Sequence, residues 1–381
     1  MKIGIDARLF GPKTAGGGLG RYIQQLITHL QKLDHENEYV LFLRKSNWEE
    51  FKETPNFKKV MADYHWYTLE EQIKMPQKVR AEKLDLMHYP HFNVPIMART
   101  RFIMTIHDLI LLEHPTTRAT TLGPLKYKLK FAGYKKVISQ GLRRAKEIIA
   151  VSEYTKKSIL KYFPKTVAQK IHVIHEAASE LAQEDATDPT KDMEFLSSRQ
   201  IRRPFLLYVG NSYPHKNLET LTRAFRKILE AKPDLQLVLA GQENYFSKRV
   251  EKDARELGLK VPEQVNFTGF IPDKDLPKLF RQASLYVFPS LLEGFGLPPL
   301  EAMNFGLPVA SSNSSCLPET LGSAAIYFNP KDIDDMAGAI IQGLDNQALR
   351  KTLINAGNLQ LQKYSWEKMA KETLEIYRRA Y

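Results

Sequence analysis

A chain of 381 residues, 43% of them hydrophobic and 10% aromatic, is long enough for two globular domains whose cores need no disulfides. The single cysteine, Cys316, excludes an intramolecular disulfide and fits a reducing compartment, so we expect a cytoplasmic protein. The start, MKIGIDARLF, alternates like a strand and lacks the apolar segment of a signal peptide, and no run of about eighteen apolar residues predicts a membrane span.

The net charge of +12 is concentrated in the first half of the chain. Residues 1–175 hold 30 Lys and Arg against 16 Asp and Glu, whereas the remainder holds 25 against 27. The densest part is 125–146, LKYKLKFAGYKKVISQGLRRAK, with eight basic residues and no acidic one. Such a field favours an anionic partner, namely nucleic acid, an anionic membrane surface or a phosphorylated substrate.

Apolar runs alternate with helical patterns through the first half. After a strand at 2–8, a glycine-containing loop and a helix at 19–33, we predict further strands at 39–44, 84–89, 101–108, 147–152 and 170–175. Alternation of strands and helices predicts a parallel sheet covered on both faces. The polar segment 176–204 then reads as a linker with a short helix.

The same pattern restarts after the linker. A strand at 205–210 and an amphipathic helix at 217–231 precede predicted strands at 236–241, 265–269, 285–290, 308–312 and 324–328. We therefore predict an α/β protein of two doubly wound, Rossmann-like domains, 1–180 and 200–363, facing each other across a cleft. Ligands of such sheets lie beyond the carboxyl ends of the strands, so the loops after strands are where chemistry is expected.

The stretch SLLEGFGLPPLEAM, residues 290–303, places two acids after a buried strand. Its glycines allow a ligand to approach the backbone, and Pro298 and Pro299 favour the start of a helix. Glu301 is then expected in the first turn of that helix, where its carboxylate can accept two hydroxyl hydrogen bonds, as from a ribose. The alternative is that Glu301 only complements the helix dipole and that Glu293 is a solvated loop acid.

Three other loops carry polar groups at strand ends. Lys216, in GNSYPHKN (210–217), sits where a helix begins, which suggests a shared anion such as a diphosphate; the alternative is a surface lysine. The loop TAGGGLGR (14–21) is either an anion-binding turn or a mobile one, and it lacks the spacing of a P-loop. His107 either contacts a sugar hydroxyl or has no role of its own beside Asp108, which would then cap a helix. The sequence has no metal-binding motif, so we expect no protein-held metal.

Together these segments resemble family 4 of the retaining glycosyltransferases, which have the GT-B architecture. Glu293 and Glu301 match its EX7E signature, and further matches are GGGLGRY (16–22), IHD (106–108), VSEYTKKSI (151–159), YVGNSYPHKNLETL (208–221) and TGFIPDKDLPKLF (268–280). The resemblance covers nearly the whole chain. Within the family, the chain looks most like bacterial mannosyltransferases of cell-surface polysaccharide synthesis.

The resemblance implies roles for the second domain. Glu301 would bind the ribose of a nucleotide sugar, Lys216 its diphosphate, and Glu293 the transferred sugar as a catalytic group. The loop 271–276 would border the base. Backbone amides of the donor site would come from Phe295, Gly296 and Leu297. Many members have an arginine where this chain has Asn211, so at the diphosphate site that Asn211 lines, Lys216 would act with His215 or with backbone amides alone.

In the first domain, the resemblance implies an acceptor-binding role. His107 would contact the transferred sugar as a second catalytic residue, and Gly17 and Gly18 would lie against donor phosphate or acceptor. The C-terminal segment 364–381 would form the helix that crosses back to the first domain in GT-B proteins.

The resemblance implies a hexosyltransferase that acts with retention of configuration. It would move mannose from GDP-mannose to a lipid-linked or oligosaccharide acceptor. It would need no cofactor and no metal. Alternatives are a UDP-sugar-dependent transferase and a GT-B phosphorylase or epimerase. A basic nucleic-acid-binding protein is the alternative outside enzymes, but no nucleic-acid-binding signature appears, and we expect no such partner. We expect the segment 125–146 to dock on an anionic membrane, at the inner face of the cytoplasmic membrane; the alternative is a solvated basic face.

Overall fold

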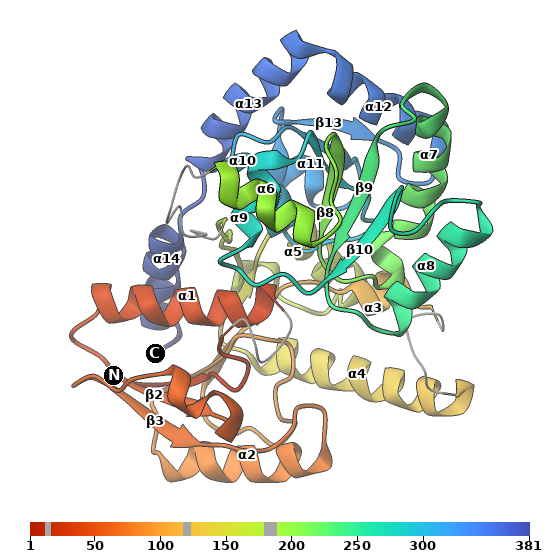
Figure 1. Cartoon of the computed structure of the whole chain (residues 1–381). Coiled ribbons are helices and arrows are strands. Elements are labelled where there is room, and N and C mark those ends of the chain that lie inside the picture. Colours follow the sequence, from red (N-terminus) through yellow and green to blue (C-terminus); the bar gives the residue numbers. More distant parts are fainter. Residues whose placement is uncertain (12–16, 117–122, 179–188) are drawn as a thin grey trace. The chain divides into compact units, whose positions relative to one another are not determined.

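The computed structural model describes residues 1–11, 17–116, 123–178 and 189–381, which divide into two compact units. Unit 1 comprises Met1–Glu176 and Ser365–Tyr381, and unit 2 comprises Ala177–Tyr364. Each unit is built around its own parallel sheet (Figure 1). The prediction of two Rossmann-like α/β domains is thereby confirmed.

Within the described part of unit 1, the sheet has seven strands in the order β3-β2-β1-β4-β5-β6-β7. The strands are β1 (Lys2–Asp6), β2 (Glu38–Leu43), β3 (Phe57–Met61), β4 (Leu86–Tyr89), β5 (Phe102–Ile106), β6 (Ile148–Ala150) and β7 (Ile171–Val173). The helices are α1 (Gly18–Leu33), α2 (Leu69–Ala81), α3 (Ile110–Glu113), α4 (Pro124–Arg144), α5 (Glu153–Tyr162), α14 (Trp366–Ala380) and the 3-10 turns η1 (Lys45–Glu50) and η3 (Ala168–Lys170).

The sheet of unit 2 has six strands among the described residues, in the order β10-β9-β8-β11-β12-β13. They are β8 (Phe205–Val209), β9 (Gln236–Ala240), β10 (Val265–Gly269), β11 (Leu285–Phe288), β12 (Val309–Ser312) and β13 (Ala325–Phe328). The helices are α6 (Pro189–Ser198), α7 (Leu218–Ala231), α8 (Tyr245–Glu256), α9 (Leu276–Gln282), α10 (Leu297–Asn304), α11 (Leu317–Leu321), α12 (Ile333–Asp345), α13 (Gln347–Leu361) and the 3-10 turn η4 (Pro214–Lys216).

The central strands are largely buried because helices cover both faces of each sheet. All five residues of β5 and of β9 are buried, which fits continuous hydrophobic runs rather than alternating ones. The edge strand β3 was not predicted from the sequence. Its residues FKKVM include two lysines and an exposed methionine, so it lacks the apolar run of a central strand.

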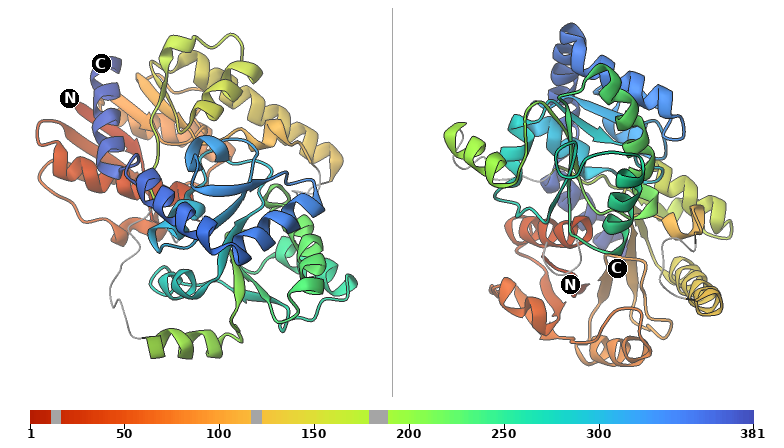
Figure 2. Two further views of the ribbon diagram at one scale, coloured as in Figure 1. Left: turned by 90° about the horizontal axis from the view of Figure 1, so that it is seen from above. Right: turned by 45° about the vertical axis from the view of Figure 1, so that its right-hand side comes forward.

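The C-terminal helix α14 belongs to unit 1, as predicted. It packs against α1, and its Tyr377 hydroxyl lies 2.8 Å from Nδ1 of His88 in β4. The other ring nitrogen of His88 lies 2.9 Å from the hydroxyl of Thr105 in β5, so a buried hydrogen-bond chain joins the helix to the sheet. The two chain ends therefore lie in the same unit (Figure 2).

Candidate functional site

The strand order of unit 2 reverses between β8 and β11, and this is where ligands of doubly wound sheets bind. The loop after β8 covers residues 210–217, and the loop after β11 covers residues 289–296. Both loops end in a helix, α7 and α10 respectively. The sequence-predicted residues Lys216, Glu293 and Asn211 lie on these two loops.

Backbone and side-chain hydrogen bonds fasten the two loops together. The N–H of Leu291 donates to the carbonyl of His215 at 2.8 Å. The side-chain amide of Asn217 donates to the carbonyl of Pro289 at 3.1 Å and to that of Pro330 at 2.7 Å. Asn217 adopts a left-handed conformation with φ of 60°, which asparagine tolerates better than most residues. Sequence reasoning missed this positioning role, although the asparagine directly before a helix was a visible signal.

The structure brings Lys216 and Glu293 into direct contact. The Lys216 ammonium donates to Oε1 of Glu293 at 2.6 Å, and the two side chains are only 14% and 10% exposed. The N–H of Glu293 also donates to the hydroxyl of Ser315 at 3.1 Å, which fixes the acid from a third loop. The alternative interpretations of a solvated loop acid and a surface lysine are therefore wrong. The ammonium also lies 5.6 Å from the ring centre of Phe288.

The helix α10 begins at Leu297, directly after Gly296 in a left-handed conformation. At Gly296, φ is 93°, and a Cβ atom would stand 2.8 Å from Cδ2 of Leu317, so the position requires glycine. Pro298 and Pro299 follow as the second and third helical residues and carry no N–H. Leu297 is thus the one residue among the first three of the helix with a backbone donor for an anion.

The prediction that Glu301 lies in the first turn of this helix is wrong. Because the helix starts before the prolines rather than with them, Glu301 is its fifth residue and falls in the second turn. The dipole of the helix acts mainly on its first turn, so it stabilises this carboxylate less than expected. Glu301 is instead 3% exposed, held within the unit.

Asn211 and Phe295, two further residues predicted for the donor site, make contacts within unit 2. The backbone carbonyl of Asn211 accepts from the Tyr208 hydroxyl at 2.7 Å, and its side-chain oxygen accepts from the N–H of Tyr213 at 3.3 Å. The Phe295 side chain is 3% exposed, and its ring meets that of Tyr364 edge-on at 5.2 Å. The Phe295 side chain therefore belongs to the interior of unit 2, and the contact of its backbone amide with a donor stays a prediction.

In unit 1, His107 follows β5 and has both ring nitrogens engaged. Nδ1 lies 2.8 Å from Oε1 of Glu176, and Nε2 lies 3.0 Å from the carbonyl oxygen of Pro90. A carboxyl oxygen and a backbone carbonyl can each accept a hydrogen bond from the ring, which favours the doubly protonated form of His107. Burial by itself lowers the pKa of His107, but the hydrogen bond and charge of Glu176 outweigh it and raise the pKa. Glu176 was not identified from the sequence.

The glycine loop is described only from Gly17 onward, and residues 14–16 of the predicted anion-binding turn lie outside the described residues. Gly17 has φ of 96° and precedes α1, and Gly18 is the first residue of that helix. The loop thus ends where a helix N-terminus offers backbone amides, as the sequence indicated.

The basic segment 125–146 is largely the helix α4. Its Ile138 and Leu142 belong to the core of unit 1, and its Phe131 and Tyr134 are partly buried and pack against that core. Its exposed residues include Lys126, Lys128, Lys130, Lys135, Lys136, Arg143 and Lys146, together with Leu129 at 76% exposure. Among the described residues, no helix is long and apolar enough to cross a membrane. Nor do three His, Cys, Asp or Glu side chains gather as a metal-binding group anywhere in the described ranges.

Comparison with protein families supports the division into two units. Residues 16–178 match the family described as Glycosyltransferase Family 4, and residues 193–360 match Glycosyl transferases group 1. The two matches adjoin and together cover most of the chain.

Characterised relatives point in the same direction. The chain is 26% identical to the O-antigen chain mannosyltransferase B of Escherichia coli over 382 residues, covering 95% of this chain and 96% of the relative. It is 31% identical over 239 residues to the serotype-specific mannosyltransferase WbdA of Escherichia coli, a match that covers 62% of this chain but only 29% of that longer protein.

Solved structures share the fold over the full chain. A sucrose-phosphate synthase from Thermosynechococcus elongatus superimposes with a TM-score of 0.80 at 21% identity, covering 100% of this chain and 98% of that one. WaaG, a glycosyltransferase involved in lipopolysaccharide biosynthesis, gives a TM-score of 0.75 at 15% identity, with 99% of both chains covered. The two family matches together make this chain a glycosyltransferase with a Family 4 first half and a group 1 second half, and its two parallel-sheet units have the GT-B fold.

Proposed function

We propose that this glycosyltransferase moves a hexose, mannose from GDP-mannose, with retention to a saccharide acceptor in the synthesis of a cell-surface polysaccharide. The observation that carries the proposal is the Lys216–Glu293 pair, which joins the loops after β8 and β11 beside the start of α10. One loop pair thus offers a cation for a diphosphate and a carboxylate for a sugar within 2.6 Å of each other.

In this proposal Lys216 binds the diphosphate of the donor, and Glu293 then turns to the hydroxyls of the transferred sugar. Glu301 binds the ribose. The backbone amides of Phe295, Gly296 and Leu297 stabilise the charge that develops on the leaving diphosphate, a contribution that preorganised donors make well. His107 remains the second residue that we propose to contact the transferred sugar.

Retention follows from an oxocarbenium-like transition state in which the diphosphate leaves and the acceptor attacks from the same face. The leaving diphosphate takes the proton of the acceptor hydroxyl, so the protein needs to position the reactants and stabilise charge rather than supply a base. Lys216 and the amides offset the charge of the diphosphate, and we propose that no metal is required.

Mannose as the sugar is supported by relatives named as mannosyltransferases, among them the O-antigen chain mannosyltransferase RfbU of Salmonella typhimurium, 27% identical over 239 residues. The second candidate is a UDP-sugar donor. It is favoured by the fold neighbour HepE of Anabaena, solved with UDP and glucose, which has a TM-score of 0.74 at 18% identity.

A donor screen separates the two candidates. Binding of GDP-mannose, GDP, UDP-glucose and UDP is measured by isothermal titration calorimetry, and donor hydrolysis is followed in EDTA. We expect tighter binding of the guanosine nucleotides and EDTA-resistant hydrolysis of GDP-mannose. Tighter binding of the uridine nucleotides would show that the donor is a UDP-sugar. A requirement for inorganic phosphate would show that the enzyme is a phosphorylase rather than a transferase.

We also propose that α4 docks the enzyme on an anionic membrane surface near a lipid-linked acceptor. Seven exposed cations of the segment 125–146 and the exposed Leu129 form a basic face with an apolar side chain, while the opposite face of α4 is held in the core. Each basic residue near an anionic bilayer contributes about 1 kcal/mol. Sedimentation with phosphatidylglycerol vesicles is expected to fall with salt and with Lys128→Glu/Lys135→Glu. Absence of sedimentation at low salt contradicts docking, and tight retention of RNA points to nucleic acid instead.

A further inference from the structure

The described part of the chain contains five residues other than glycine in a left-handed backbone conformation. They are Tyr67, Lys83, Gln200, Asn217 and Ser315, with φ between 51° and 66°. In this conformation the Cβ atom of an L-residue lies too close to the following carbonyl oxygen. Such strain persists only where the surrounding structure holds it, so each of the five residues needs a local cause.

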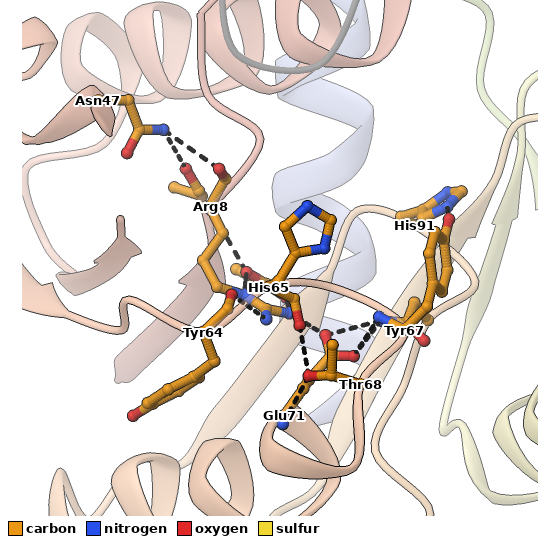
Figure 3. Close-up of polar contacts among 11 residues, drawn as sticks. Arg8, Asn47, Tyr64, His65, Tyr67, Thr68, Glu71 and His91 are labelled. Atoms are coloured by element: carbon orange, nitrogen blue, oxygen red, sulfur yellow. Dashed lines mark hydrogen bonds and ion pairs between the residues drawn. The ribbon is translucent and has the colours of Figure 1, made fainter. Parts of the chain in front are cut away.

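Four of these residues have a cause in their immediate surroundings. Lys83 and Gln200 lie two residues beyond the ends of α2 and α6, where a left-handed residue commonly closes a helix, and their N–H groups donate back into the helix. Asn217 is an asparagine, which tolerates this conformation, and its side chain fastens the loops after β8 and β11. In unit 1, the N–H of Tyr67 donates to Oε2 of the buried Glu71 at 2.8 Å (Figure 3). The fifth residue remains to be explained.

Ser315 lies in the segment 313–317, which leads from β12 into α11, and this segment contacts the loop after β11. The hydroxyl of Ser315 accepts a hydrogen bond from the backbone N–H of Glu293 at 3.1 Å. Leu317 lies beside Gly296, where an added Cβ atom would stand 2.8 Å from Cδ2 of Leu317. The segment 313–317 therefore supports the turn 293–296 at its first and at its last residue.

The segment 313–317 is itself fastened to the sheet of unit 2. The N–H of Asn313 donates to the carbonyl of Phe328 in β13 at 2.9 Å. A glycine in place of Ser315 would adopt φ of 56° without strain but would offer no hydroxyl to Glu293. The serine thus carries backbone strain and holds Glu293 from an element anchored in the sheet, which is how a functional group is kept in its working geometry.

We propose that Ser315 is a positioning residue for the transferase reaction and that its hydroxyl fixes the backbone of Glu293. The carboxylate of Glu293 pairs with Lys216 and, in the proposed function, turns to the transferred sugar, so its side chain must rotate on a backbone that stays in place. Ser315 acts through Glu293 and is not assigned to the nucleotide, so its loss slows turnover and leaves nucleotide binding unchanged. The assignment rests on the proposed function and adds to it a residue from a third loop.

Three variants separate the hydroxyl of Ser315 from the strain of its backbone. Ser315→Ala removes the hydroxyl and keeps the strain, whereas Ser315→Gly removes both. Gln200→Gly is the matched control, because Gln200 is exposed in the same unit and has φ of 57°. Its carbonyl accepts from the side chain of Gln236 at the start of β9, at the edge of the sheet opposite to the donor loops. Since glycine adopts positive φ freely, Ser315→Gly should melt above Ser315→Ala, and Gln200→Gly at or above the wild type.

The readouts are kcat and KM for GDP-mannose, with the methyl glycoside of an α-linked dimannoside as acceptor, and the Kd for GDP in calorimetry, all on the full chain. Both Ser315 variants should lower kcat by about ten- to hundredfold, the order of loss that a misplaced reacting group causes, and leave the Kd for GDP unchanged. The fall in kcat should be the same in both variants despite their different melting temperatures, which a merely structural role would not produce. Gln200→Gly should keep the kcat, KM and Kd of the wild type.

The outcomes separate this inference from the proposed function. A wild type that binds neither GDP nor UDP and transfers no sugar defeats the proposed function, and the assignment of Ser315 falls with it. If the wild type is active but Ser315→Gly transfers as well as the wild type, or if kcat follows the melting temperature, the assignment is overturned while the donor site stands. A raised Kd for GDP in the Ser315 variants overturns it as well, because the hydroxyl would then act on the nucleotide. If the wild type transfers from a UDP-sugar, the same comparison is made with that donor and UDP.

Discussion

Replacing Glu293 by glutamine tests two proposed roles of this acid separately. One role is to neutralise Lys216, and the other is to act on the transferred sugar. In the protein without donor, Glu293 neutralises Lys216 at 2.6 Å. When the diphosphate of a donor arrives, it can take over that neutralisation and release Glu293 toward the sugar. The Glu293→Gln variant should therefore be less stable without nucleotide, bind GDP at least as well as the wild type, and lose transfer.

The size of the stability loss follows from the burial of the pair. Removing one partner of a fully buried ion pair costs about 3–5 kcal/mol, and an exposed pair contributes less than about 1 kcal/mol. The side chains of Lys216 and Glu293 are 14% and 10% exposed, and glutamine can still accept a hydrogen bond from Lys216. We expect a loss of about 1–3 kcal/mol, which is about 2–4 °C in melting temperature per kcal/mol for domains of roughly 150–250 residues.

Thermal melts with and without GDP, calorimetric GDP titrations and a transfer assay measure the three effects. GDP should restore most of the lost stability because its diphosphate pairs with Lys216, and transfer should fall by at least about a hundredfold. Asp334→Asn is the matched control, since Asp334 and Lys227 form an exposed pair at 2.5 Å in the same unit. We expect that control to change stability by less than about 1 kcal/mol and GDP binding not at all.

The reasoning is refuted if Glu293→Gln weakens GDP binding as much as Lys216→Met does. That result would mean that the acid acts as part of the diphosphate site rather than as a group displaced by it. A stability unchanged from the wild type would equally contradict the ion pair as a feature of the protein in solution.

Three further predictions concern the surroundings of this site and unit 1. Glu301→Gln should raise the Kd for GDP by about 10- to 100-fold in calorimetry, the loss expected for hydrogen bonds to a charged group, and an unchanged Kd would remove Glu301 from the ribose site. Gly296→Ala should lower stability by about 1–3 kcal/mol in urea melts, because a residue with a Cβ is strained at φ of 93° and meets Leu317, and a neutral result would contradict the left-handed start of α10. Pairing with Glu176 raises the pKa of His107 in the folded state, so its stabilisation is complete below the unfolded pKa of about 6.5 and is lost as the pH rises through the folded pKa. Melts of the wild type and Glu176→Gln should converge at alkaline pH, and a constant difference across pH would count against this assignment.

The sheets could be predicted because buried parallel strands are continuous apolar runs. β8, β9 and β11 each begin at the predicted residue, since Leu, Val, Tyr and Phe fill β8 and β11 and Leu and Val fill the centre of β9. The edge strand β3 escaped because its two lysines break that pattern. The edge position alone was not the obstacle, since the other edge strands β7, β10 and β13 were predicted.

The candidate donor loops could be located but not their contacts. The positions of Lys216 and Glu293 at strand ends indicated one shared site, yet they are 77 residues apart, and nothing local indicates that they form an ion pair. Glu301 was placed in the wrong turn because two prolines were taken as the start of the helix, whereas Gly296 sets that start one residue earlier.

The ion pairs of unit 1 could not be predicted from the sequence either. The pairing of Arg8 with Glu71 spans 63 residues and depends on the register of β1 against its neighbours, which composition does not reveal. His107 was noticed because it follows a strand, but its partner Glu176 lies 69 residues further on, in the segment after β7. Long-range pairs of this kind follow only from the three-dimensional arrangement.

The measurement that tests the central claim most directly is a proton NMR time course of GDP-α-mannose with the enzyme and, as acceptor, the methyl glycoside of an α-linked dimannoside. We predict the release of GDP and the appearance of a new α-mannosyl anomeric signal in the wild type, and neither in Glu293→Gln. A β-anomeric product, or transfer that persists in Glu293→Gln, would contradict the account.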